Sequence, residues 1–126
     1  MTSLPPLPAT IVDDFNRIRS GFNETIGLRF TAVRYEAIEA EIEIGPRLHQ
    51  PYGLVHGGVY STMIETLTSV GAALNLAAVG RHAVGLENST SFLKAVREGT
   101  LVGRATPLAR GKRSHCLLYT SDAADE

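Results

Sequence analysis

Hydrophobic and polar residues alternate without interruption in one segment of the first half of the chain. From Ile38 to Ile44 every second side chain is apolar, and three glutamates occupy the positions between. Successive side chains of a strand point to opposite faces, so this pattern predicts a β-strand with one buried and one solvated face. Apolar residues at Leu28, Phe30 and Val33 predict a shorter strand before it. Together the two segments predict an antiparallel pair.

A longer segment has the periodicity of an α-helix. From His56 to about Val79, apolar residues recur every three or four positions, at Val59, Met63, Leu67, Val70, Leu74 and Ala77. Small residues surround them, so we expect a helix that is buried over much of its circumference. Glu65 is the only Asp, Glu, Lys or Arg in this segment.

Weaker patterns complete the order of the elements. Helical spacing of apolar residues predicts a short helix over about 10–21, after an extended proline-rich leader at 1–9. Glycine and proline residues at 45–55 predict a loop. Three further strands are predicted over residues 83–93, 100–108 and 114–120.

This order of elements predicts an α+β fold. An antiparallel sheet wrapped around one central helix is the simplest way to bury the apolar faces of both. The length of 126 residues suits a single domain, 1–126. A domain of this size leaves much of its surface exposed, which favours association with a second copy.

Composition narrows the possible functions. The formal net charge is −1, so no global charge indicates nucleic acid or an anionic membrane as a partner. No stretch approaches the ~18 consecutive apolar residues of a membrane span. The single cysteine, Cys116, cannot form an internal disulfide, and it predicts a reducing, cytoplasmic location.

Basic residues are nevertheless concentrated in one segment. Between Lys94 and Arg113 the chain has six Lys or Arg residues and one acidic residue, Glu98. A local basic segment in a nearly neutral protein suits a small polyanion better than a duplex. The alternative is an ordinary solvated face.

Glu65 is the residue with the most unusual surroundings. A lone carboxylate on an apolar helix is costly unless it is paired or solvated, and small or polar residues such as Thr62 and Ser69 leave room beside it. The helix begins at Gly57 and Gly58, where free backbone N–H groups form a site for an oxyanion. A carboxylate with an oxyanion site suits acyl transfer. The alternative is a Glu65 that simply faces solvent.

The carboxylate and the oxyanion site cannot meet within one chain. Eight residues separate Gly57 from Glu65, which corresponds to ~12 Å along a helix that rises 1.5 Å per residue. An antiparallel copy of the helix, related by a two-fold axis, would bring each Gly57 close to the partner's Glu65. The predicted site is therefore shared between two subunits.

These residues also carry a family resemblance. The segment QPYGLVHGG at 50–58, followed by Glu65-Thr66-Leu67, resembles the signature of hotdog-fold thioesterases. The segment from Val84 to Gly99 is similar to the same family. The subgroup that the chain resembles contains phenylacetic-acid-pathway, 4-hydroxybenzoyl-CoA, 1,4-dihydroxy-2-naphthoyl-CoA and enterobactin-pathway proofreading thioesterases. The resemblance implies a hotdog fold and hydrolysis of a small or medium acyl- or aroyl-CoA.

The resemblance also implies a role for each residue of the motif. Glu65 would be the general base or the nucleophile, and the Gly57 N–H would polarise the thioester carbonyl. Gln50 would orient the carbonyl or the water, and His56 would support the oxyanion loop. Ser69 would assist Glu65 or position water.

The substrate would be held by further residues on both sides of the thioester. The phosphates of coenzyme A would be contacted by the cationic side chains of Lys94, Arg97, Lys112 and Arg113. Gly58 and Phe92 would also contact the substrate. No cofactor and no metal site is predicted. The expected partners are acyl-CoA and further copies of the chain, in a homodimer or homotetramer.

Two departures from the family pattern affect these expectations. Phe92 and Leu93 stand where the naphthoyl and enterobactin members show a histidine pair, which indicates a more apolar acyl pocket. Polar residues follow Tyr119 directly. We therefore expect a truncated or altered last strand and an atypical tail at 117–126.

Two other functions stay open at this point. A hotdog hydratase would use a histidine with an acid at a different spacing, which the HGG-to-Glu arrangement disfavours. A non-catalytic or inactivated acyl-CoA-binding module is favoured by the altered C-terminus. The intact Gln50, Gly57 and Glu65 favour an enzyme instead.

Overall fold

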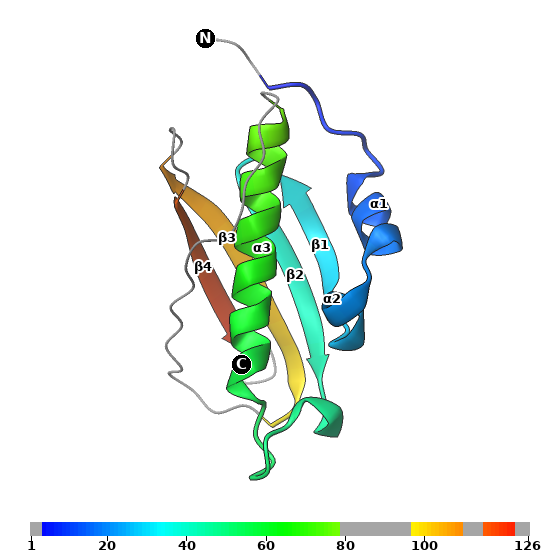
Figure 1. The fold of residues 1–126 in the computed structure, drawn as a ribbon, viewed down its shortest axis with the longest axis vertical. Coiled ribbons are helices and arrows are strands. Elements are labelled where there is room, and N and C mark those ends of the chain that lie inside the picture. The colour runs from blue at the N-terminus through cyan, green and yellow to red at the C-terminus, as the bar shows by residue number, and fades with distance from the viewer. Residues whose placement is uncertain (1–3, 79–96, 110–114, 123–126) are drawn as a thin grey trace.

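The computed structural model describes residues 4–78, 97–109 and 115–122. Its elements are, in chain order, α1 (Ile11–Ile18), α2 (Gly21–Thr25), β1 (Arg29–Arg34), β2 (Ala37–Ile44), the 3-10 helix η1 (Pro46–Leu48), α3 (Gly57–Ala77), β3 (Gly99–Ala109) and β4 (His115–Asp122). Within these residues the strands form one sheet in the order β1-β2-β3-β4, and all pairs are antiparallel. Helix α3 lies along one face of this sheet (Figure 1). The predicted α+β arrangement is confirmed. The predicted strand at 83–93 lies outside the described residues.

The alternation that predicted β2 produces the two faces of the sheet. Ile38, Ala40 and Ile42 are at most 1% exposed and face α3. On the solvated face, Glu39 pairs with Arg104 at 3.2 Å and Glu41 pairs with Arg29 at 2.8 Å. The strand therefore separates core from water in the way that its sequence predicts.

Close packing of α3 on the sheet depends on a glycine in β3. Gly103 lies opposite Ala40 of β2. A Cβ atom at Gly103 would come within 2.4 Å of the Met63 Sδ and 2.9 Å of the Leu67 Cδ1. Met63 and Leu67 are themselves fully buried. The missing side chain at Gly103 therefore makes room for the apolar stripe of α3.

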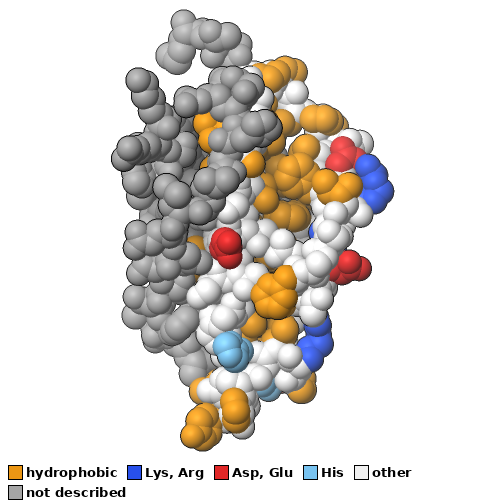
Figure 2. Space-filling model, in the orientation of Figure 1, with side chains coloured by type: hydrophobic (Ala, Val, Ile, Leu, Met, Phe, Trp, Pro, Cys, Tyr) orange, Lys and Arg blue, Asp and Glu red, His pale blue; other side chains and the backbone are white. Residues whose placement is uncertain are grey.

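Full burial in α3 is confined to one stripe of the helix. Among its 21 residues only Val59, Met63 and Leu67 are buried, and they form the stripe that faces the sheet. Val70 and Leu74 of α3 are partly buried against the core, as are Ile11 and Phe15 of α1. Figure 2 shows apolar side chains gathered between these two helices. Most other residues of α3 are partly buried, and Glu65, Ala73 and Ala77 are exposed. The expected burial over much of the circumference is therefore found only in part.

The predicted helix at 10–21 is two helices. Arg19 and Ser20 have extended backbone, and Gly21 begins α2 with a φ of 62°. The Asn16 amide donates to the Phe30 carbonyl at 2.9 Å and accepts from the Phe30 N–H at 2.7 Å. These two bonds fix α1 against the outer side of β1 and partly cover that strand's unpaired backbone groups.

The last described strand is longer than predicted. β4 runs from His115 to Asp122, and its pairing with β3 extends to Asp122 opposite Leu101. The polar residues that follow Tyr119 thus continue the strand for two positions beyond the predicted end at Thr120, because pairing with β3 outweighs their low strand propensity.

Among the described residues, no helix combines the length and apolar character needed to cross a membrane.

Candidate active site

The start of α3 is organised by His56. This residue is the N-cap of the helix, with extended backbone, and its Nδ1 accepts a hydrogen bond from the Gly58 N–H at 2.8 Å. A Cβ atom at Gly58 would lie only 2.9 Å from that Nδ1. The second glycine of the HGG motif therefore makes room for the imidazole. Because Nδ1 accepts, the neutral ring carries its proton on Nε2.

The cap leaves the Gly57 N–H available. The Gly58 N–H donates to His56 Nδ1, and the Val59 N–H donates to the His56 carbonyl at 2.9 Å. Within the described part of the chain, no hydrogen bond of the Gly57 N–H is found. This donor lies at the positive end of the helix dipole, where a developing negative charge is stabilised.

Gln50 organises the loop that precedes the helix. Its side-chain oxygen accepts from the Tyr52 N–H, and its carbonyl accepts from the Gly53 N–H at 3.0 Å. Its own N–H donates to the Leu54 carbonyl at 2.7 Å. These bonds close a tight turn at residues 50–54. The side-chain NH2 group of Gln50 remains as a donor, while its oxygen serves the turn.

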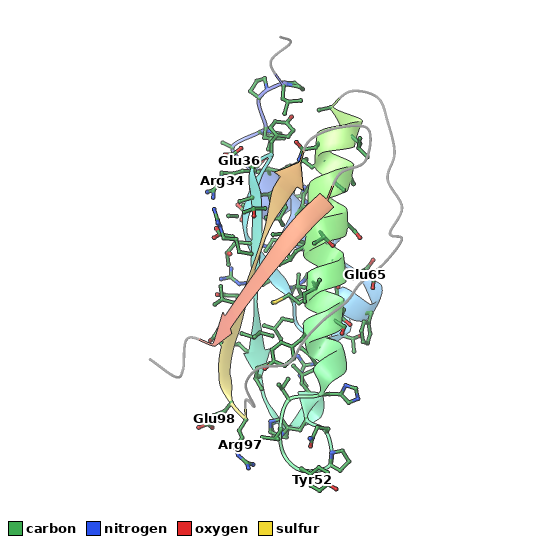
Figure 3. All side chains as sticks on the ribbon, turned by 90° about the vertical axis from the view of Figure 1, so that its left-hand side faces the viewer. Arg34, Glu36, Tyr52, Glu65, Arg97 and Glu98 are labelled. Atoms are coloured by element: carbon green, nitrogen blue, oxygen red, sulfur yellow. The ribbon has the colours of Figure 1, made fainter. Side chains whose placement is uncertain are left out.

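Glu65 projects from the middle of α3 on the side away from the sheet (Figure 3). Its side chain is exposed, and it lines an open pocket of about 310 Å³. The pocket is formed by residues of α2 and α3, namely Phe22, Asn23, Thr62, Glu65, Thr66, Ser69 and Val70. Among the described residues, no hydrogen bond or ion pair engages the Glu65 carboxylate, so it is free to act on a bound molecule.

Only part of the predicted site lies in the pocket. Ser69 lies with Glu65 in the pocket lining, as their spacing of four residues on a helix predicts. Gly57, Gln50 and His56 belong to the beginning of α3 and its preceding loop, and they are not part of the lining. One subunit thus presents the Glu65 pocket and the glycine-rich start of α3 at different places along the same helix.

Two residues of the pocket were not predicted from the sequence. Phe22 and Asn23 lie on α2, 39 to 48 positions before the residues of α3 that share the lining. The Thr66 hydroxyl donates to the Asn23 Oδ1 at 2.8 Å, which ties α2 to α3. Neither residue belongs to a periodic pattern or a motif, so the sequence carried no signal for this contact.

The two described cations of the basic segment, Arg97 and Arg104, lie at different places. The Arg97 guanidinium lies against the 50–54 turn, because a Cβ at Gly53 would be 3.3 Å from its Nη1. Figure 3 shows Arg97 and Tyr52 at the same end of the molecule. Arg104, by contrast, pairs with Glu39 on the outer face of the sheet. The predicted contacts Phe92, Lys94, Lys112 and Arg113 lie outside the described residues.

Among the residues that the structure describes, no three His, Cys, Asp or Glu side chains are grouped so that they could hold a metal ion.

Comparison with known proteins identifies one family. Residues 52–122 match the Thioesterase superfamily. The proofreading thioesterase EntH of Cronobacter turicensis is 37% identical over 93 residues, which span 74% of this chain and 67% of EntH. A Mycobacterium tuberculosis protein provisionally named an esterase, Rv1847, is 39% identical over 101 residues, or 79% of this chain and 72% of that protein.

Solved structures agree with this result. The structure of the same Mycobacterium tuberculosis protein has a TM-score of 0.79 at 37% identity and covers 83% of this chain and 86% of its own. The thioesterase HI1161 of Haemophilus influenzae has a TM-score of 0.83 at 27% identity and covers 91% of this chain and 81% of its own. The predicted hotdog fold is confirmed.

Proposed function

The chain belongs to the thioesterase superfamily, and on that premise we propose that it hydrolyses a small or medium acyl- or aroyl-CoA to the free acid and coenzyme A. Thioester hydrolysis as such follows from the family. The acyl-CoA substrate and the roles of individual residues are the proposal. The observation that carries it is the Glu65 carboxylate, which lines an open pocket on the same helix that begins with a free Gly57 N–H.

Glu65 acts on the thioester carbonyl in one of two ways. As a general base, it takes a proton from water while the water oxygen attacks the carbonyl carbon. As a nucleophile, its carboxylate attacks directly and forms a mixed anhydride, which water then hydrolyses. In both routes the C–S bond breaks and coenzyme A leaves as a thiolate, which takes up a proton.

The oxyanion that forms during attack is stabilised by the Gly57 N–H of a second subunit. This assignment is supported by the separation of ~12 Å between positions 57 and 65 along one helix. It is also supported by the exposure of Glu65, which leaves this carboxylate open to a second subunit. A homodimer, alone or within a homotetramer, then has two equivalent sites.

Three further residues assist this chemistry. His56 holds the first turn of α3 so that the Gly57 N–H stays free. The Gln50 NH2 group, on the turn that precedes the helix, donates to the thioester carbonyl or orients the water. Ser69 lies in the lining with Glu65 and positions the water or assists the carboxylate.

Coenzyme A is held at the end of the molecule where the 50–54 turn lies. Arg97 is exposed there and contacts this turn, and a guanidinium suits the phosphates of the nucleotide. Lys94, Lys112 and Arg113 complete the proposed phosphate contacts, while Phe92 and Gly58 contact the substrate near the thioester. The single cysteine of the chain is in keeping with a cytoplasmic enzyme.

Release of coenzyme A from a panel of acyl- and aroyl-CoA thioesters, followed by capture of the free thiol, tests this function. We expect steady turnover with at least one small or medium thioester and none with the matching oxygen ester. Binding of acyl-CoA without any release of thiol across the panel would instead identify a non-catalytic binding module.

A further inference from the structure

Phe22 is a large apolar side chain that the fold leaves uncovered beside the candidate carboxylate. Its side chain is 63% exposed, yet it lines the same pocket as Glu65. An exposed phenylalanine alone has no meaning. A phenylalanine that borders a carboxylate in a pocket lined by both apolar and polar groups is typical of a ligand site.

The position of Phe22 is fixed by the local structure of α2. Gly21 begins this helix with a φ of 62°, a conformation that favours glycine. The Ile26 N–H donates to the Phe22 carbonyl, and the Leu28 N–H donates to the Asn23 carbonyl, both at 3.0 Å. The part-buried bond from Thr66 to Asn23 then holds α2 against α3. Phe22 is therefore held at the pocket by its neighbours.

The pocket suits one end of a thioester better than the other. Its volume of about 310 Å³ lies at the lower limit of small-molecule sites, which span ~300–1,000 Å³. Among the described residues, its lining contains no Lys or Arg, whereas the phosphates of coenzyme A require cations. Phe22 and Val70 supply apolar surface on opposite helices. The pocket therefore fits an apolar acyl group, with the nucleotide outside it.

We propose that Phe22 contacts the acyl group of the substrate and determines its preferred size. This inference rests on the proposed function and extends it, because it assigns α2 of the Glu65 subunit to acyl recognition. The ring removes the carbons beyond the carbonyl from water, and a two-carbon acyl group is too short to gain from that contact. Phe22 thus affects selectivity among acyl groups and leaves the chemistry at the carbonyl unchanged.

The test compares selectivity in variants at two exposed positions. Phe22→Ala removes the ring, and Phe22→Leu keeps an apolar side chain of intermediate size. Ile18→Ala is the matched control, because Ile18 is 70% exposed on α1 and does not line the pocket. For each full-length protein, kcat/KM is measured with acetyl-, hexanoyl- and benzoyl-CoA, and folding is checked by thermal melting.

The expected result is a change in ratio. Phe22→Ala should lower kcat/KM for hexanoyl- or benzoyl-CoA, relative to acetyl-CoA, by about tenfold, the lower end of what a methylene-sized change in an apolar pocket produces. Phe22→Leu should lower it less, and Ile18→Ala should leave it unchanged. An unchanged ratio in Phe22→Ala would overturn the inference while leaving the proposed function intact. A wild-type protein that hydrolyses none of the thioesters would contradict the proposed function itself, and the inference with it.

Discussion

At the scale of single residues, Glu65 and Gly57 are candidate site residues that the sequence itself indicates, because each is unusual for its surroundings. Glu65 is the only charged residue of an apolar helix, and Gly57 begins that helix. Phe22 and Asn23 could not be found in this way. Their contact with the Glu65 pocket depends on the turn at Gly21 and on the bond from Thr66 to Asn23, and a long-range contact leaves no local pattern.

Replacement of Glu65 by glutamine should abolish turnover and preserve the fold. The amide can neither accept a proton from water nor form an anhydride, so we expect kcat to fall by about 10²–10⁴-fold, the usual loss for an acid–base group. The rate is measured by capture of the coenzyme A thiol that is released. Binding of acyl-CoA to the variant should persist. Glu24→Gln, at an exposed carboxylate of α2 outside the pocket, is the control and should behave as wild type. If Glu65→Gln retains half of the activity, Glu65 is not the catalytic carboxylate.

Replacement of Arg97 by alanine should weaken substrate binding through the nucleotide. We expect KM for acyl-CoA to rise roughly fivefold, since an exposed charge pair contributes ~1 kcal/mol. KM for the corresponding acyl-pantetheine, which lacks the nucleotide, should not change. Arg104→Ala is the matched control, because Arg104 pairs with Glu39 on the outer face of the sheet. An equal increase in KM for both substrates would show that Arg97 is an ordinary solvated residue and does not bind the nucleotide.

At the scale of elements, strands with clear alternation and the long periodic helix were predicted within a few residues of their bounds. The predictions were less accurate where tertiary contacts determine the end of an element. Extended backbone at Arg19 and Ser20 divides the first helix, and pairing with β3 carries β4 on to Asp122. The degree of burial around the rest of α3 could not be predicted either, because apolar periodicity shows which face can be covered and not how many layers cover it.

The packing of α3 on the sheet predicts a specific effect of a mutation in β3. Gly103→Ala would place a methyl group 2.4 Å from the Met63 Sδ, in a region where Met63 and Leu67 are fully buried. Overpacking of this kind costs ~1–3 kcal/mol, which corresponds to a Tm lower by roughly 4–12 °C at ~4 °C per kcal/mol. Differential scanning calorimetry measures the change.

Gly45→Ala provides the comparison for this prediction. A Cβ atom at Gly45 meets nothing within 4 Å, and its backbone is extended with a φ of −158°. Its Tm should therefore stay within about 2 °C of wild type or rise slightly. Equal stability of the two variants would show that α3 does not pack on β3 at Gly103.

At the scale of the whole molecule, we propose that two subunits share each active site. Within one subunit, the Glu65 pocket does not include Gly57, Gln50 or His56, and a rigid helix keeps positions 57 and 65 apart. The structure also indicates how the proposed oxyanion donor, the Gly57 N–H, can be removed. Gly57 is the first residue of α3 and His56 is extended, with φ −64° and ψ 132°. Proline is favoured at the first position of a helix and after a residue with extended backbone. Gly57→Pro therefore removes the N–H with little disturbance of the helix.

Complementation between two inactive variants tests this claim most directly. Glu65→Gln and Gly57→Pro proteins should each be folded, by circular dichroism, and inactive. When the two are co-expressed with different affinity tags, each heterodimer has one site with both lesions and one site with neither. Random pairing makes about half of the dimers heterodimeric, so about a quarter of wild-type activity should return, and purified heterodimers should reach about half. Purified heterodimers that stay inactive, while both parent proteins are folded, would place each site within a single chain and contradict the shared site.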